Sequence, residues 1–196
     1  MIDHAKKILK ETIMTGADMS SSDADILLKE IPIRAFQKGD ILLHQGDEPN
    51  VSFYVINGCV RQYLTDASGK EVTVDFYTES SSINMLSYAD AQNLSMYSLS
   101  CIENSVLVVC PHFEMSDLQE MDPKMSQMIQ NIFFDAYSQL QSQYAQFKLM
   151  TPEERFLYML NHQRNLMRRV PQKILASYLD ITPETFSRFK KKHMSK

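Results

Sequence analysis

The C-terminal residues 170–192 constrain the fold most tightly, because they predict two short helices joined by a sharp turn. Apolar residues recur at helical spacing in the first helix, at Ile174, Leu175, Tyr178 and Leu179. Asp180 follows them directly, and aspartate is one of the few residues other than glycine that tolerates a positive φ. We therefore expect the chain to turn at Asp180 and the next residue.

The second helix begins with a start signal. The hydroxyl of Thr182 can accept an unpaired amide hydrogen, and Pro183 fits the first helical position. Phe186 and Phe189 give the helix a buried side, and its other side is polar and basic. Such a pair of helices is a helix-turn-helix, which lays its second helix in the major groove of DNA. A helical hairpin that never contacts DNA has the same spacing, so spacing alone leaves both interpretations open.

The division of charge along the chain favours DNA binding. Residues 1–150 hold 10 lysines and arginines against 20 acidic residues, a net charge of −10. Residues 151–196 hold 10 against 4, a net charge of +6. A basic tail on an acidic body suits a polyanionic ligand held at the tail. The alternative is a solvated basic helix without a partner.

The middle of the chain has the pattern of a β-domain. Short runs rich in β-branched and aromatic residues alternate with turn-forming pieces that contain Gly39, Gly46, Gly58 and Gly69. The runs cover residues 33–36, 41–44, 53–56, 60–64, 72–77, 96–102 and 106–110. Many short strands at close spacing predict an antiparallel roll or barrel. Two helices are predicted before it, within residues 1–30, with the serines at residues 20–22 capping the second.

One long helix is predicted over residues 123–150, since no glycine or proline interrupts it after its first residue. Its apolar stripe is wide enough to need covering on more than one side, so we predict a dimer interface partly packed on the roll. The alternative is a helix buried within one chain. The predicted interface residues are Met125, Ile129, Ile132, Ala136, Leu140 and Tyr144. Thr151, Pro152 and Glu154 then form a capping box, which places a domain boundary at residues 150/151.

Composition and motifs argue against several classes of protein. No apolar run approaches the ~18 residues of a membrane span and the N-terminus is not a secretion signal, so we expect a cytoplasmic protein without membrane contact. Cys59, Cys101 and Cys110 lack metal-ligand spacing and are expected to be buried free thiols. Neither a nucleophile elbow nor a phosphate-cradling glycine loop nor a paired-histidine motif occurs, so we expect neither an enzyme nor a metal site.

Five segments, taken in their order and spacing, resemble the CRP/FNR family of bacterial transcription regulators. They are residues 36–47, 53–61 and 69–71 in the roll, and residues 176–179 and 182–188 in the tail. The resemblance implies an α+β protein with an N-terminal antiparallel, jelly-roll-like β-roll of the cyclic-nucleotide-binding type. The implied domains are a sensor roll at 1–122, a dimerisation helix at 123–150 and an all-α helix-turn-helix domain at 151–196. It further implies a homodimer on double-stranded DNA, with RNA polymerase as a further candidate partner.

The resemblance also assigns the DNA-contacting residues. Carried over by position, the recognition helix begins at Pro183 and reads bases with Glu184 and Arg188. The chemistry agrees, because arginine can fork onto guanine and glutamate can accept from the cytosine amino group. The residues expected near phosphates are Thr182, Thr185, Arg168, Arg169, Lys173, Lys190, Lys191 and Lys192. The alternative for Arg188 is a surface arginine paired with Glu184.

The family's cyclic-nucleotide cassette is missing. Binders of this family use a Gly-Glu pair and a later Arg followed by Ser or Thr, whereas residues 71–123 here contain neither arginine nor lysine. A cyclic phosphate would lack its charged partner, so we expect no response to cyclic AMP. Residues 1–58 contain no cysteine, so the iron–sulfur centre of the oxygen-sensing branch is not expected either.

No cofactor is predicted, and a small polar effector of unknown identity is left open. Glu79 could replace the ribose-binding glutamate, and an ordinary loop is the alternative for the whole segment around it. The candidate pocket residues are Tyr77, Glu79, Ser80, Ser82, Ser95 and Ser98. The sequence thus predicts a homodimeric, sequence-specific transcription regulator. The alternative is a ligand-binding or protein-interaction module of the same fold whose tail does not bind DNA.

Overall fold

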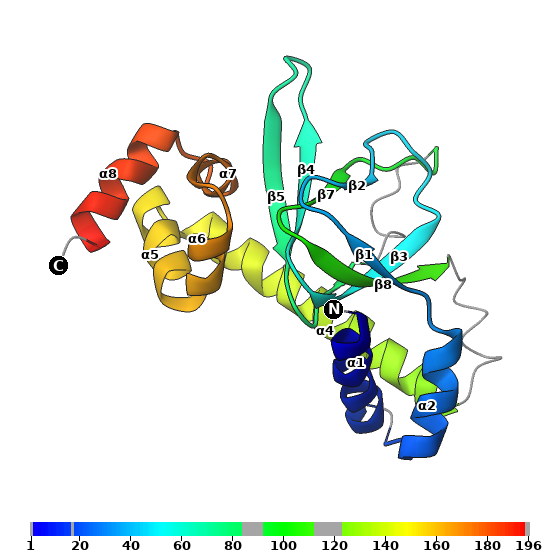
Figure 1. The fold of residues 1–196 in the computed structure, drawn as a ribbon. Helices are drawn as coiled ribbons and strands as arrows, with labels where there is room; N and C mark the ends of the chain where they lie inside the picture. Colours follow the sequence, from blue (N-terminus) through cyan, green and yellow to red (C-terminus); the bar gives the residue numbers. More distant parts are fainter. Residues whose placement is uncertain (1, 17, 84–91, 112–122, 195–196) are drawn as a thin grey trace.

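The computed structural model describes residues 2–16, 18–83, 92–111 and 123–194 (Figure 1). The two predicted N-terminal helices are α1 (Ile2–Gly16) and α2 (Ser21–Glu30). Ser20 caps α2, because its hydroxyl accepts a hydrogen bond from the Asp23 amide at 3.3 Å. The apolar sides of both helices pack on Ile56, Val106 and Val108 of the sheet that follows.

Eight short strands follow in the described residues, and they include all seven predicted ones with small changes of boundary. They are β1 (Ile33–Phe36), β2 (Ile41–Leu43), β3 (Val51–Asn57), β4 (Val60–Thr65), β5 (Glu71–Tyr77), β6 (Ser82–Ile83), β7 (Ser98–Cys101) and β8 (Ser105–Pro111). The two-residue strand β6 was not predicted. It pairs with β3 through Tyr54 and Ser82.

The strands form two four-stranded antiparallel sheets, in the orders β1-β8-β3-β6 and β2-β7-β4-β5. Leu43, Phe53, Val55, Leu99 and Leu107 are buried in the core between them. The predicted antiparallel roll is therefore confirmed, and we call these strands the sheet domain. Strand β5 is an edge strand of the second sheet, which leaves one side of its backbone unpaired within that sheet.

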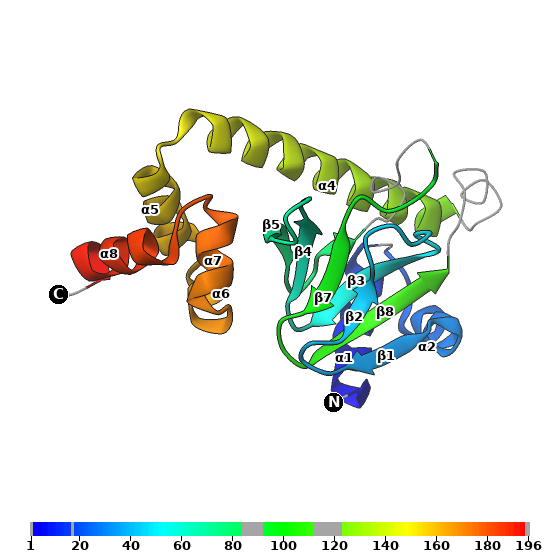
Figure 2. The same ribbon diagram turned by 90° about the horizontal axis from the view of Figure 1, so that it is seen from above.

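The predicted long helix is α4 (Pro123–Leu149), which runs beside the sheets to a C-terminal group of helices (Figure 2). That group, the helical domain, contains α5 (Pro152–His162), α6 (Arg164–Arg169), α7 (Gln172–Tyr178) and α8 (Pro183–Met194). Thr151 and Glu154 form the predicted capping box at the start of α5. The short helix α6 was not predicted.

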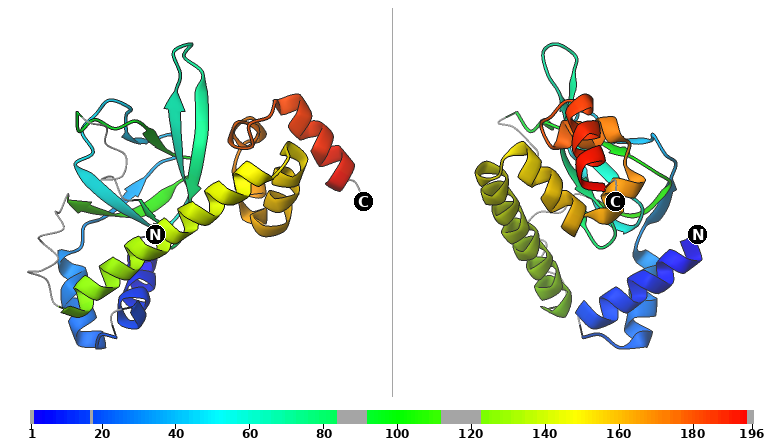
Figure 3. Two further views of the ribbon diagram at one scale, coloured as in Figure 1. Left: turned by 180° about the vertical axis from the view of Figure 1, so that it is seen from behind. Right: turned by 90° about the vertical axis from the view of Figure 1, so that its left-hand side faces the viewer.

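The helical domain lies beside β5, with α7 facing the sheets and α8 on the far side (Figures 1 and 3). None of the described helices has the length and hydropathy needed to cross a membrane. In the same described part of the chain, no group of three or more potential metal-ligating side chains comes together.

The three cysteines are unpaired, as predicted. Cys59 and Cys101 are buried and Cys110 is half-buried. Burial raises the pKa of the Cys59 thiol to about 12 and that of the Cys101 thiol to about 11. Both thiols are therefore protonated and unreactive at neutral pH.

Candidate nucleic-acid interface

The helix-turn-helix predicted over residues 170–192 is present as α7 and α8. Leu175, Ala176 and Phe186 are buried where the two helices cross, each with at most 1% of its surface exposed. Phe156 of α5 closes this core, and its ring packs edge-on against Phe186 with a centroid distance of 5.3 Å. The small side chain of Ala176 allows the close approach of the helices.

The turn between α7 and α8 has the predicted conformation. Asp180 adopts a φ of 54°, and the neighbouring Ile181 amide donates to the Ala176 carbonyl at 3.0 Å. Thr182 Oγ1 accepts from the Thr185 amide at 3.2 Å, so the predicted cap of α8 is confirmed. These local bonds fix the angle at which α8 leaves the helical domain.

The residues predicted to contact DNA are accessible on α8 and at the start of α7. The exposed ones are Thr182, Glu184, Arg188, Lys191, Lys192 and Lys173, and the half-buried ones are Thr185 and Lys190. Helix α8 lies on the side of the helical domain that faces away from the sheets (Figures 1 and 2). Its outer face is thus open to a partner as large as a duplex.

Some of these side chains already have protein partners. Lys192 Nζ donates to Glu153 Oε1 at 2.7 Å, and His193 Nε2 lies 2.6 Å from the same oxygen. No ion pair joins Glu184 and Arg188, both of which lie in the described part of the chain. The guanidinium of Arg188 lies over the ring of Phe189 instead, 5.8 Å from its centroid.

Arg169, a predicted phosphate contact, is held by the sheet domain instead. Its Nη1 donates to Glu79 Oε2 at 2.9 Å, its Nη2 donates to Glu79 Oε1 at 2.7 Å, and its Nε donates to Glu103 Oε1 at 3.0 Å. Nη2 also donates to Glu103 Oε1 and to the Gly58 carbonyl, the latter at 2.8 Å. We call Arg169, Glu79, Glu103 and Gly58 the Arg169 cluster.

The charges in the Arg169 cluster stabilise one another. Partial burial works to raise the pKa of Glu79, but hydrogen bonds from Arg169 and the Gly58 amide outweigh it, so the net pKa lies below its usual value. The two carboxylates, Glu79 first, raise the pKa of Arg169 further above its usual range. Glu79 and Arg169 therefore stay ionised at neutral pH.

Gly58 is the backbone anchor of the cluster, and no other residue fits its position. Its φ is +118°, and an added Cβ would lie 2.1 Å from Ser105 Oγ and 2.7 Å from Ser105 Cα. Its amide donates to Glu79 at 3.0 Å while its carbonyl accepts from Arg169. The turn between β3 and β4 thus orients both charged partners.

Further contacts join the helical domain to strand β5. Ser177 Oγ of α7 accepts a hydrogen bond from the Thr73 amide at 2.9 Å, so it pairs a backbone donor of this edge strand. Beside it, the ring of Tyr178 packs edge-on against Phe76 with a centroid distance of 5.2 Å. Phe76, Cys59 and Ile102 share one buried cluster with the core of the helical domain.

Asp75 is a half-buried acidic residue close to this junction. Burial raises its pKa to about 6, although a hydrogen bond from the Phe76 amide at 2.8 Å acts in the opposite direction. Burial also raises the pKa of Tyr178, and the nearby charge of Asp75 raises it further. Burial thus disfavours the ionised form of Asp75 in the folded protein.

The described part of the chain does not gather the six candidate pocket residues into one hollow. Glu79 is bound to Arg169, Tyr77 donates to Gln62 at 3.0 Å, and Ser95 donates to the Tyr97 carbonyl at 2.7 Å. Ser80 adopts a φ of 67° in the turn before β6, where Ser82 is half-buried. Ser98 is the only one of the six that lines the pocket described next.

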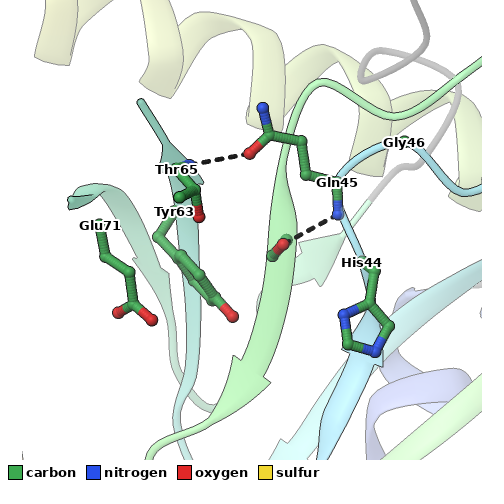
Figure 4. Close-up of a pocket in the computed structure, with 7 residues that line it drawn as sticks. His44, Gln45, Gly46, Tyr63, Thr65 and Glu71 are labelled. Carbon is green, nitrogen blue, oxygen red and sulfur yellow. Dashed lines mark hydrogen bonds between the residues drawn. The ribbon is translucent and has the colours of Figure 1, made fainter. Parts of the chain in front are cut away.

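An open polar hollow of about 440 Å³ lies over strands β4, β5 and β7 and the turn that follows β2 (Figure 4). Its lining residues are His44, Gln45, Gly46, Tyr63, Thr65, Glu71 and Ser98. Gln45 spans it with two hydrogen bonds, from its amide to Ser98 Oγ at 2.9 Å and from the Thr65 amide to its Oε1 at 2.8 Å. Its lining residues include neither lysine nor arginine, and its one carboxylate, Glu71, is paired with Arg61.

Helix α4 exposes aromatic side chains along one side. Phe134, Tyr137 and Tyr144 have 71%, 61% and 59% of their surfaces exposed, which is unusual for such large apolar groups. Of the predicted interface residues, Tyr144 is in this exposed set and Ile129 is half-buried. Met125, Ile132, Ala136 and Leu140 lie on α4, but their side chains are outside the described set.

Sequence reasoning missed Glu103, Thr73 and the interfacial role of Ser177. No local pattern marks them, because each acts through a partner 66 to 106 residues away in the chain. A charge count offers one signal: Glu79 and Glu103 are carboxylates in a segment, residues 71–123, that lacks any lysine or arginine to pair with them.

Comparison with known proteins agrees with this architecture. Residues 33–122 match the family of cyclic nucleotide-binding domains. Among curated proteins, none matches the chain.

Three solved structures illustrate the similarity, which extends over most of the chain. FixK2 from Bradyrhizobium japonicum is 15% identical with a TM-score of 0.67, over 84% of this chain and 85% of that one. The c-di-GMP-responsive global regulator CLP of Xanthomonas campestris is 14% identical with a TM-score of 0.67, over 90% and 92%. A CRP/FNR-family transcriptional regulator from Eubacterium rectale is 14% identical with a TM-score of 0.64, over 91% and 85%. The predicted resemblance to CRP/FNR regulators is therefore confirmed at the level of the fold.

Proposed function

We propose that this chain is a homodimeric, sequence-specific DNA-binding transcription regulator. One observation carries the proposal: α8 presents Glu184, Arg188 and Lys191 to solvent from a helix that is rigidly held by its cap and its buried phenylalanines. An arginine and a glutamate one turn apart supply a base-reading pair, and the lysines supply phosphate contacts. The likeness in fold to solved regulators supports the same conclusion.

Dimerisation is supported by the exposed aromatic side of α4. Phe134, Tyr137 and Tyr144 would lose their contact with water if a second copy packed along the same side. A twofold pair of chains would also present two α8 helices, as recognition of two half-sites requires. The dimer would therefore cover the aromatic side chains that α4, in its described part, leaves exposed in a single chain.

We further propose that the sheet domain does not respond to cyclic AMP. Glu79, the one carboxylate suited to a ribose, is already bound to Arg169, and residues 71–123 provide no lysine or arginine for a phosphate. Millimolar cyclic AMP should leave the melting temperature unchanged, because a ligand that does not bind the folded state cannot stabilise it. An increase of several degrees would contradict this part of the proposal.

The experiment that tests DNA binding is selection of bound duplexes from a random-sequence pool, followed by a salt titration of the selected site. A regulator should enrich one palindromic sequence and lose affinity steeply as salt rises. The second candidate function, a ligand-binding or interaction module with an inactive tail, predicts no enrichment and no binding in dilute buffer. Enrichment of a sequence would exclude that second candidate.

A further inference from the structure

We propose that Arg169 is a switch residue for which the sheet domain and the DNA backbone compete, so that docking of the helical domain on β5 lowers the affinity for DNA. This inference rests on the proposed DNA-binding function. It adds that Arg169, one of the cations expected to contact phosphates, has a competing partner within the same chain. The competitor is the pair of carboxylates of Glu79 and Glu103.

The geometry sets the two uses of Arg169 against each other. Its Nε, its Nη2 and one N–H of its Nη1 donate to the sheet domain, to Glu79, Glu103 and the Gly58 carbonyl. Of the five N–H donors of the guanidinium, this leaves at most one on Nη1, which is too few for a two-pronged contact with a phosphate. Arg169 must leave the cluster before it can make such a contact with a duplex.

The net charge of the cluster also weakens DNA binding in the docked state. Arg169 brings one positive charge to the cluster, whereas Glu79 and Glu103 bring two negative charges, so the docked cluster carries a net charge of −1. The side chains of the two carboxylates are 40% and 32% exposed, so a phosphate approaching this end of α6 would meet their repulsion. Release of the helical domain separates its cations from these two charges.

The cluster also connects the helical domain to the segment in which an effector site was predicted. Glu79 and Ser80 lie in the turn between β5 and β6, and Ser80 holds a φ of 67° while its amide donates to the Val55 carbonyl at 2.9 Å. A residue other than glycine in this conformation is held there by its surroundings. A change in this turn would therefore move Glu79 and act on Arg169 directly, without passing through α4.

The Thr73 amide reports whether the helical domain is docked. It lies on edge strand β5 and donates to Ser177 Oγ of α7, so undocking exposes it to solvent. Its hydrogen exchange should therefore be slow in the docked state and faster after release. This readout measures docking independently of any DNA contact.

The test uses the full chain and the double variant Glu79→Gln/Glu103→Gln. Glutamine keeps the shape of each side chain and an oxygen that can accept from the Gly58 amide, but it removes both charges from the cluster. The control is Glu11→Gln/Glu48→Gln, which makes the same change in net charge at two exposed positions outside the cluster. Affinity for a random-sequence duplex at low salt is measured for all three proteins, since non-specific binding already depends on phosphate contacts.

We expect the cluster variant to bind the duplex at least about fivefold more tightly than the control variant, because the apparent affinity rises as the released fraction grows. We also expect faster exchange at Thr73 in the cluster variant without DNA, and in the unmodified chain once DNA is added. Equal affinity of the two variants, or a Thr73 amide that stays protected at saturating DNA, would overturn the proposal.

Failure of the proposed function would look different. If none of the three proteins bound the duplex in dilute buffer, the proposed DNA binding would be refuted, and so would the proposed competition for Arg169. Faster Thr73 exchange in the cluster variant would still show that Glu79 and Glu103 hold the helical domain on β5. The two failures are therefore distinguishable in one set of measurements.

Discussion

Arg169 and Glu79 form a two-pronged ion pair across 90 residues of sequence, with Nη1 to Oε2 at 2.9 Å and Nη2 to Oε1 at 2.7 Å. This fork joins the last residue of α6 to the turn after β5, and so joins the helical domain to the sheet domain. Its geometry is the bidentate arrangement in which arginine and a carboxylate bind most strongly.

The first prediction concerns the stability that this ion pair provides. Arg169→Ala leaves one half-buried carboxylate, one exposed carboxylate and the Gly58 carbonyl without their shared donor, so the free energy of unfolding should fall by about 1–3 kcal/mol. Urea denaturation measures the loss. The matched control is Arg168→Ala, which removes an exposed arginine at the neighbouring position and should cost less than about 0.5 kcal/mol. Equal losses in the two variants would show that the cluster adds no stability.

The second prediction concerns base reading by α8. Arg188 is exposed and has no ion-pair partner in the described part of the chain, so it is available to fork onto a guanine. Arg188→Ala should weaken binding to the selected site by about 1–3 kcal/mol and relax the preference at one base pair in each half-site.

Lys191→Ala is the comparison for Arg188, because Lys191 is exposed on the same helix but is expected to contact only phosphates. Loss of Lys191 should lower the affinity for selected and for random duplexes by similar factors, and should make the dependence of affinity on salt shallower. Competition assays against single-base variants of the site separate the two behaviours. An Arg188 variant with unchanged base preference would remove this residue from the recognition set.

The third prediction concerns pH. The usual pKa of an aspartic acid is near 3.8, and burial raises that of Asp75 to about 6, so between these values the folded protein binds more protons than the unfolded chain. The contribution of Asp75 to the free energy of unfolding therefore falls as pH rises from about 4 to about 6, and stays low above that range.

Asp75→Asn removes this penalty while leaving an oxygen to accept from the Phe76 amide. The variant should be more stable than the unmodified chain by up to about 3 kcal/mol at pH 8, and the gain should vanish near pH 4. Thermal unfolding at a series of pH values measures it. A gain that does not change with pH would mean that packing, and not ionisation, sets the effect.

The fourth prediction concerns self-association through α4. Tyr144→Glu places a charge within the exposed aromatic side, where a second copy would have to bury it, and should weaken the dimer by at least about 2 kcal/mol. Ser142→Glu is the control, since it adds the same charge at an exposed position on nearly the opposite side of the helix. Sedimentation equilibrium gives both association constants. Two variants with equal constants would exclude this side of α4 as the interface.

The sequence predicted most reliably the features that local rules determine. The spacing of Thr151 and Glu154 alone predicts the start of α5. Asp180 occupies a position with positive φ, which its small polar side chain tolerates. Short runs rich in β-branched and aromatic residues, separated by turn-forming pieces, located seven strands, and the structure pairs them as an antiparallel roll. Each of these signals lies within a few residues of the feature that it predicts.

Contacts between distant segments could not be predicted in the same way. Arg169 has the composition and position of a phosphate contact, and only the folded chain shows that Glu79 and Glu103 surround it. In the sequence, Ser177 looks like any surface serine of a helix, and only the folded chain shows that the Thr73 amide of β5 donates to it. The described residues do not bring the six candidate pocket residues together, because these were chosen by polarity along one segment, whereas the hollow in the structure is formed across three strands.

The most direct test of the account is fluorescence anisotropy of the unmodified chain with a duplex selected by it, titrated at a series of salt concentrations. We predict two protomers per duplex and a logarithm of affinity that falls linearly with the logarithm of salt, with a slope of about −0.9 per neutralised phosphate. Single chains that show no change in anisotropy even in dilute buffer would contradict it.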